Sequence, residues 1–214
     1  MDSKLLILPA PTERATFCGA TGSGKTYAQL LLAGQYYGTR QIIILDTKAD
    51  KSIKRLDAAV STTLKGCSKF KDKPLCIYRP NGLELGNPYV LDAFCQWIYE
   101  RKNTIVLIDE GTQLNKSHVL PMAGFLNLYT RGRDREISTW IGTQRPVGLP
   151  TIVFSEAEWV FEFNLRTKKD RITIGRSTSD EMLQNIPDKH GVRIFNAELG
   201  IKYATDIKEA MAWT

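Results

Sequence analysis

The sequence predicts an α/β fold in which helices cover both faces of a mainly parallel sheet, giving a three-layer sandwich. The first observation is a glycine-rich loop at residues 19–26, which follows a short apolar segment and opens a helical pattern. The second is a pair of continuous apolar runs, QIIIL at 41–45 and TIVLI at 104–108, typical of strands buried on both faces. The third is the alternation of strand and helix signals, which implies parallel βαβ units.

The individual elements follow from local patterns of apolar and turn residues. Apolar runs predict strands at residues 16–19, 41–45, 75–78, 104–108, 138–141 and 158–163. Helical spacing predicts helices at residues 25–36, 89–101 and 120–129. From residue 166 onward we expect a charged turn, a short helical piece at 180–184 and a hairpin around 196–200. No linker, repeat or low-complexity segment divides the chain, so residues 1–214 are expected to form a single domain.

Composition narrows the class of protein. The chain has 214 residues, and Lys plus Arg exceed Asp plus Glu by 29 to 23, which gives a net charge of +6. This excess suits a polyanionic partner, although a similar charge can serve solubility alone. No apolar run approaches the roughly 18 residues needed to span a bilayer, so we expect no integral membrane segment.

The glycine-rich loop matches GxxxxGK[ST], the pattern of a phosphate-binding loop, or P-loop. In this pattern backbone N–H groups point at a β-phosphate, and the following helix adds its dipole. Lys25 is expected to neutralise the β- and γ-phosphates, and the Thr26 hydroxyl to bind Mg²⁺. The sequence therefore predicts an ATP and Mg²⁺ site formed by Gly19, Ala20, Thr21, Gly22, Ser23, Gly24, Lys25, Thr26 and Tyr27.

Two adjacent carboxylates end the apolar run at 105–108. Asp109, at the carboxyl end of the expected strand, is placed to hold Mg²⁺ through water. Glu110 beside it can orient and deprotonate a water aimed at the γ-phosphate. A nucleotide kinase must keep water out, so this pair favours ATP hydrolysis. The alternative is an acidic pair that only ends the strand.

A third polar segment, Thr143-Gln144-Arg145-Pro146, follows the strand expected at 138–141. If this strand neighbours the strand before Asp109, Gln144 lies beside the γ-phosphate. Its amide can donate to the phosphate and accept from the water, so Gln144 can respond to hydrolysis. A polar residue at a strand end is common, so Gln144 alone is weak evidence. Its weight comes from its place in the sequence after the P-loop and the Asp109-Glu110 pair.

The P-loop, IVLIDE and TQRP in this order resemble the HerA/FtsK superfamily of DNA-pumping ATPases, over residues 14–165. Asp46-Thr47-Lys48 resembles the D-P-K of that superfamily, with Thr in place of Pro. Arg133 stands eleven residues before Gln144, as an arginine does in FtsK-type motors. The chain lacks the membrane segments of FtsK and the N-terminal barrel of HerA, and it is similar to genome-packaging ATPases of membrane-containing icosahedral viruses.

The resemblance implies a RecA-like sheet with core order 5-1-4-3-2 and an ATP-hydrolysing motor that translocates double-stranded DNA without reading its sequence. Such a motor would package a viral genome into a preformed capsid. The resemblance also implies a homo-hexamer with ATP between subunits and a trans arginine, for which Arg131, Arg133 and Arg135 are candidates and position favours Arg133. The implied partners are a capsid vertex or membrane proteins, in the host cytoplasm and also at the packaging vertex.

A basic cluster after the last expected strand is a candidate DNA contact. A solvated surface explains the same residues equally well, and no base-reading motif is present. The cluster consists of Arg166, Lys168, Lys169 and Arg171, with Arg176 further on.

Two other functions remain open on sequence grounds. One is a filamentous-phage assembly or secretion ATPase of the same superfamily, although such proteins usually carry a membrane segment. The other is an ATP-gated interaction protein that hydrolyses ATP poorly, against which Glu110 and Gln144 argue. Stimulation of ATP hydrolysis by double-stranded DNA would separate a DNA motor from such an interaction protein.

Overall fold

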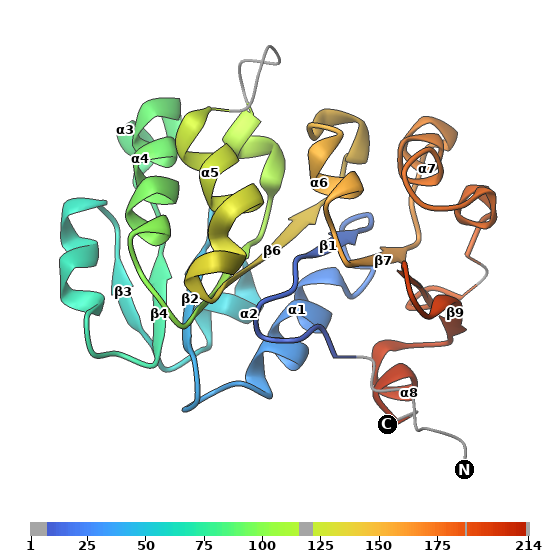
Figure 1. The fold of residues 1–214 in the computed structure, drawn as a ribbon, viewed down its shortest axis with the longest axis horizontal. Coiled ribbons are helices and arrows are strands. Elements are labelled where there is room, and N and C mark those ends of the chain that lie inside the picture. Colours follow the sequence, from blue (N-terminus) through green and yellow to red (C-terminus); the bar gives the residue numbers. More distant parts are fainter. Residues whose placement is uncertain (1–7, 116–121, 187, 213–214) are drawn as a thin grey trace.

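A computed structural model describes residues 8–115, 122–186 and 188–212. These residues form a nine-stranded sheet in the order β3-β4-β2-β5-β6-β1-β7-β8-β9 (Figure 1). Neighbouring strands from β3 to β7 are parallel, and β8 and β9 continue the sheet as an antiparallel hairpin beside β7. The strands are β1 Ala15–Cys18, β2 Gln41–Leu45, β3 Ala59–Ser61, β4 Leu75–Tyr78, β5 Thr104–Ile108, β6 Ile137–Thr143, β7 Trp159–Phe163, β8 Val192–Asn196 and β9 Gly200–Ala204.

Helices cover both faces of the sheet. The α-helices are α1 Lys25–Gly34, α2 Lys51–Lys54, α3 Gly82–Gly86, α4 Pro88–Tyr99, α5 Ala123–Arg131, α6 Ile152–Ser155, α7 Lys168–Gly175 and α8 Ile207–Met211. Short 3-10 turns are η1 Lys65–Phe70, η2 Gly111–Asn115, η3 Gly132–Arg135, η4 Pro146–Gly148 and η5 Asp180–Leu183. Within the described ranges, no helix has both the length and the apolar character needed to cross a membrane.

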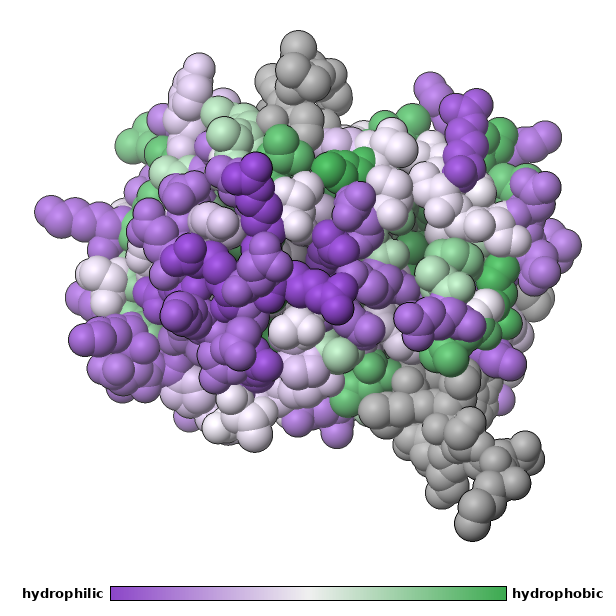
Figure 2. All heavy atoms as spheres, viewed as in Figure 1, coloured by the Kyte–Doolittle hydropathy of each residue, from purple (hydrophilic) through white to green (hydrophobic). Residues whose placement is uncertain are grey.

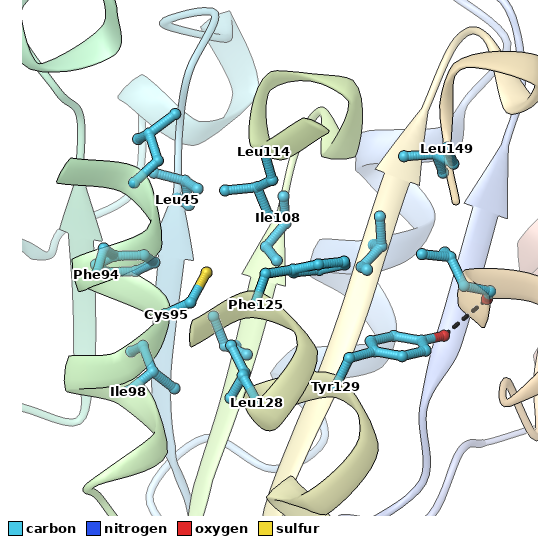
Figure 3. Close-up of a cluster of buried hydrophobic side chains, with 14 of the residues drawn as sticks. Leu45, Phe94, Cys95, Ile98, Ile108, Leu114, Phe125, Leu128, Tyr129 and Leu149 are labelled. Atoms are coloured by element: carbon cyan, nitrogen blue, oxygen red, sulfur yellow. Dashed lines mark hydrogen bonds between the residues drawn. The ribbon is translucent and has the colours of Figure 1, made fainter. Parts of the chain in front are cut away.

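The sheet separates two apolar cores, because alternate residues of a buried strand face opposite sides. On β2, Ile43 and Leu45 belong to a core that includes residues of α4 and α5, whereas Ile42 and Ile44 belong to a second core that includes residues of α1, α2 and α8. Figure 3 shows the first core, where Phe94 and Cys95 of α4 approach Phe125 and Leu128 of α5 above the strands. This arrangement confirms the predicted three-layer α/β sandwich.

The sheet order matches the order that the superfamily resemblance implies. Numbered along the chain, the core strands 1 to 5 are β1, β2, β5, β6 and β7. Their spatial order is β7-β1-β6-β5-β2, which is 5-1-4-3-2. Three parallel strands therefore bring the P-loop and the segments after β5 and β6 to one edge of the sheet, called here the carboxyl edge.

The charged turn expected after β7 is in fact mostly helical. Thr167 caps α7, because its hydroxyl accepts from the Asp170 N–H at 3.2 Å and donates to the Asp170 carboxylate at 2.6 Å. This reciprocal cap overrides the weak helical pattern of the segment. The helix predicted at 120–129 begins at Ala123, and residues 120 and 121 lie outside the described residues.

Candidate nucleotide site

The glycine-rich loop connects β1 to α1 and is fixed at its base by two neighbouring strands. The Gly19 N–H donates to Thr143 O at 3.0 Å, and the Ala20 N–H donates to Asn164 O at 2.9 Å. Gly24 precedes α1 with φ 103°, a left-handed conformation that glycine adopts without steric cost. No side chain caps the first turn of α1, so its N–H groups are available to an anion.

Lys25 carries a buried charge at the start of α1. Its side chain is 6% exposed, and it has no ion-pair partner within 4.0 Å among the described residues. Burial lowers the pKa of Lys25, against the attraction of Glu110 and Asp109. The buried Ser23 hydroxyl nearby also lacks a hydrogen-bond partner in the part of the chain that is described. A phosphate group would supply the negative charge and acceptor oxygens that these two side chains lack.

Asp109 follows β5 and is held by the loop after β2. Its carboxylate accepts from the Thr47 N–H at 3.0 Å, the Thr47 hydroxyl at 2.7 Å and the Lys48 N–H at 3.2 Å. Burial raises the pKa of Asp109, and these three hydrogen bonds only partly offset the effect. Asp109 is 4% exposed. A cation beside it would stabilise the ionised form.

Glu110 lies between the loop after β2 and the end of β6. Its carboxylate forms an ion pair with the Lys48 ammonium and accepts from the hydroxyls of Thr143 at 2.8 Å and Thr112 at 3.0 Å. Burial alone would raise the pKa of Glu110, but the hydrogen bond and charge of Lys48 outweigh it, and the pKa is lowered. Glu110 is therefore held ionised, the state required of a general base.

Gln144 links the end of β6 to the P-loop. Its side-chain Oε1 accepts from the Thr21 hydroxyl at 2.9 Å, and its backbone N–H donates to Glu110 Oε2 at 3.3 Å. The ends of β1, β5 and β6 thus bring the P-loop, the carboxylate pair and Gln144 together at the carboxyl edge. This is the juxtaposition that the three sequence segments predict.

A pocket of about 590 Å³ opens beside the P-loop, and the C-terminal segment forms part of its wall. His190, before β8, has Nδ1 3.5 Å from the Ser23 carbonyl oxygen. No sequence motif marks this wall, because only the hairpin beside β7 brings its residues here. The wall residues are Phe163, His190, Asp206, Ile207 and Lys208, and Tyr27 lines the pocket from α1.

The arginine segment lies at the opposite edge of the sheet. Arg133 precedes β6 and Gln144 follows it, so a strand of about 20 Å separates Arg133 from the nucleotide site of its own chain. The side chain of Arg133 is 64% exposed and lies 3.8 Å from Glu158. Arg135 packs on the ring of Tyr99 at 4.9 Å, whereas Arg131 is exposed.

The basic cluster after β7 divides into two kinds of residue. Arg171 donates to the carbonyl oxygens of Leu165 at 3.0 Å and Leu183 at 3.2 Å, so it joins α7 to η5. Arg166, Lys168 and Lys169 are exposed. Arg176, further along the chain, is exposed as well.

The sequence and the fold are both similar to those of known packaging proteins. No protein-family model matches the chain. It is 30% identical over 173 residues to the DNA packaging ATPase P9 of Enterobacteria phage PRD1. The aligned segment covers 78% of this chain and 70% of that protein. The genome packaging NTPase B204 of Sulfolobus turreted icosahedral virus 2, solved with ATP-gammaS, has a TM-score of 0.67 at 19% identity and covers 92% of this chain and 98% of its own.

A more distant likeness extends to a conjugation protein. The pCW3 conjugation coupling protein TcpA, solved with ATPgS, has a TM-score of 0.53 at 13% identity, covering 91% of this chain and 60% of that one. The B204 and TcpA structures, at these identities, establish the fold.

Proposed function

The chain belongs to the family of DNA-packaging ATPases that includes P9 of Enterobacteria phage PRD1, and we propose that it hydrolyses ATP to move double-stranded DNA into a preformed viral capsid. The observation that carries the proposal is the convergence of Lys25, Asp109, Glu110 and Gln144 at one edge of the sheet. In this proposal residues 1–214 act as a single motor domain, and the DNA is gripped without sequence readout.

The P-loop residues 19–27 would bind the phosphates of ATP through backbone N–H groups and the Lys25 ammonium. Thr26 and Asp109 offer the oxygen donors that Mg²⁺ prefers when it is shared with a phosphate. The fit of this pair to Mg²⁺ rests on Asp109, because a nearby cation would stabilise the ionised form of its buried carboxylate. When bound, Mg²⁺ offsets negative charge on the transferred phosphoryl group.

Glu110 and Gln144 would act on the attacking water. Glu110, held ionised by Lys48, accepts the proton of that water, and the Gln144 amide orients the water against the γ-phosphate. Gln144 also contacts Thr21 of the P-loop, which supports a role in responding to the state of the phosphate. Charge on the phosphoryl oxygens grows only in the transition state, where an arginine is most effective.

Arg133 would supply that arginine to a neighbouring subunit. Its exposed guanidinium lies at the edge opposite its own nucleotide site, so it can act only in trans. This supports a homo-hexameric ring with ATP between subunits, in which Arg131 is the alternative finger. We place the ring in the host cytoplasm and at the packaging vertex, in contact with capsid or membrane proteins.

The deciding experiment measures ATP hydrolysis with and without double-stranded DNA, alongside the native mass of the assembly. We expect DNA to raise hydrolysis by the wild type and by Lys54→Ala, an exposed lysine of α2. Lys25→Ala should bind ATP weakly and show no turnover, because the buried cation of the phosphate site is lost. Hydrolysis that does not respond to DNA would instead support an ATP-gated interaction protein.

A further inference from the structure

A basic hollow lies at the edge of the sheet opposite the nucleotide site. The loops before β2, β4 and β5 meet there and enclose about 450 Å³. These loops gather at the lower left of Figure 1, and hydrophilic side chains cover that region of Figure 2. We call it the amino-edge hollow; it is lined by Gly38, Thr39, Arg40, Gln41, Lys71, Asp72, Lys73, Pro74, Arg101, Lys102 and Asn103.

Positive charge dominates the amino-edge hollow. Five of its lining residues are cationic and only Asp72 is acidic. None of the five forms a salt bridge within the described part of the chain, although other arginines do. Lys71, Lys73 and Lys102 are exposed, and they come from two loops that are distant in sequence. Five like charges gathered around a single acidic residue repel one another, so this arrangement gains stability from a bound anion.

Arg101 is recessed in the hollow and held in one orientation. Its guanidinium stacks 3.7 Å from the centroid of the Trp97 ring, and its NH1 donates to Gln41 Oε1 at 3.2 Å. Gln41 is itself fixed, because its Nε2 donates to the carbonyl oxygens of Phe70 at 2.6 Å and Lys73 at 2.9 Å. The buried Nε of Arg101 has no hydrogen-bond partner among the described residues. Among the described residues, one Nη hydrogen of Arg101 is used and the other donors of this oriented guanidinium are not.

We propose that the amino-edge hollow binds the phosphate backbone of the translocated DNA, an inference that rests on the proposed motor function. A pre-oriented guanidinium can donate two parallel hydrogen bonds to a phosphate, and lysines from the surrounding loops act as mobile point charges. Pro74 is the one apolar side chain among the described lining residues, so the hollow lacks the apolar groups that insert into a lipid surface. Contact with phosphates alone also gives the sequence-independent grip that a packaging motor needs.

The basic cluster after β7 is a weaker candidate for this role. Arg171 is occupied by backbone carbonyl oxygens, and Arg166, Lys168 and Lys169 are exposed. The two surfaces therefore allow a comparison in which the same charge, three units, is removed from each edge of the sheet.

The test measures binding of fluorescently labelled double-stranded DNA at several NaCl concentrations. The variant Lys71→Ala/Lys73→Ala/Lys102→Ala is compared with Arg166→Ala/Lys168→Ala/Lys169→Ala in the full chain. We expect the first to weaken binding at least about 10-fold. The magnitude of the slope of log K against log salt should fall by about 2 to 3, because each lost phosphate contact accounts for about 0.9. The second should change both quantities less.

Two further readouts separate the possible failures. The first variant should keep the melting temperature and the DNA-independent ATP hydrolysis of the wild type but lose stimulation by DNA. Unchanged DNA binding in this variant, or a greater loss in the second, would overturn the proposal and leave the motor function intact. A loss of binding to phosphatidylserine vesicles with DNA binding retained would assign the hollow to a membrane. Absence of DNA binding by the wild type would instead overturn the motor function itself.

Discussion

Replacement of Lys48 by methionine tests whether the candidate general base is restrained before the reaction. In the structure Glu110 accepts from Lys48, Thr143, Thr112 and the Gln144 N–H. A carboxylate has about four lone-pair positions, so a water molecule can bind only after one donor leaves. Lys48 is the donor best placed to leave, because 37% of its side chain is exposed against 4% for Glu110.

The size of the effect follows from the strength of the Lys48–Glu110 contact. A hydrogen bond to a charged group contributes about 1.5–3 kcal/mol, and partial exposure of Lys48 reduces this to about 1–2 kcal/mol. If the contact breaks in every turnover, and the hydrogen bonds from Thr143 and Thr112 keep Glu110 ionised without it, its removal lowers the barrier by that amount, and kcat without DNA rises by about 5- to 30-fold. KM should stay unchanged, because Lys25 and the P-loop still bind the nucleotide.

The assay is steady-state ATP hydrolysis without DNA, with Lys54→Met as the matched control from an exposed site on α2. Lys48→Arg should stay near the wild-type rate, because an arginine can keep the ion pair. A fall in kcat for Lys48→Met, as large as that for Glu110→Gln, would show that Lys48 acts in the reaction and would refute the restraint. An unchanged kcat would show that the ion pair does not limit turnover.

Three further predictions concern the roles of single side chains. Glu110→Gln should bind ATP normally and hydrolyse it about 100-fold more slowly in single-turnover kinetics; weaker binding at an unchanged rate would make Glu110 a binding residue. Arg133→Ala and Lys25→Ala should each be inactive, and mixing them should restore hydrolysis at interfaces that pair an intact arginine with an intact P-loop; full activity of Arg133→Ala alone excludes the trans role. Burial raises the pKa of Glu162 to about 8 although Arg193 lies 3.1 Å away, so the folded state keeps a proton that the unfolded state loses above about pH 4.5. In urea unfolding, the stability of the wild type relative to Glu162→Gln should therefore fall on the order of 3 kcal/mol between about pH 5 and pH 8, and a constant difference would contradict the raised pKa.

The parallel core of the fold is predictable because its strands have unambiguous sequence patterns. Strands β2, β4 and β5 begin and end at the predicted residues. Each is a short apolar run followed by a charged residue, and β2 and β5 are also rich in β-branched residues. Burial on both faces requires this composition, whatever the details of packing. The positions of Asp109 and Gln144 at the carboxyl edge follow directly, because polar residues after parallel strands meet there.

Features that depend on tertiary placement could not be predicted in the same way. His190 and Lys208 line the nucleotide pocket only because β8 and β9 pair beside β7. Arg101 and Lys71 share the amino-edge hollow although thirty residues separate them in the sequence. Arg171 is held against the protein because it donates to the carbonyl oxygens of Leu165 and Leu183, which lie outside its own helix. No local pattern of residues encodes these contacts.

Strands β2 and β5 connect the two proposed sites, and this has a consequence for how the sites communicate. Gln41 begins β2 in the hollow, and Lys48 follows the same strand at the nucleotide site; Asn103 and Glu110 flank β5 in the same way. Both strands are buried and paired along their lengths, so each is expected to move as a rigid unit. A small displacement between the strands, imposed by phosphates in the hollow, would change the Lys48–Glu110 contact, which joins their far ends. Because coupling between binding sites is reciprocal, any change in ATP affinity that DNA in the hollow causes must appear as an equal change in DNA affinity caused by ATP.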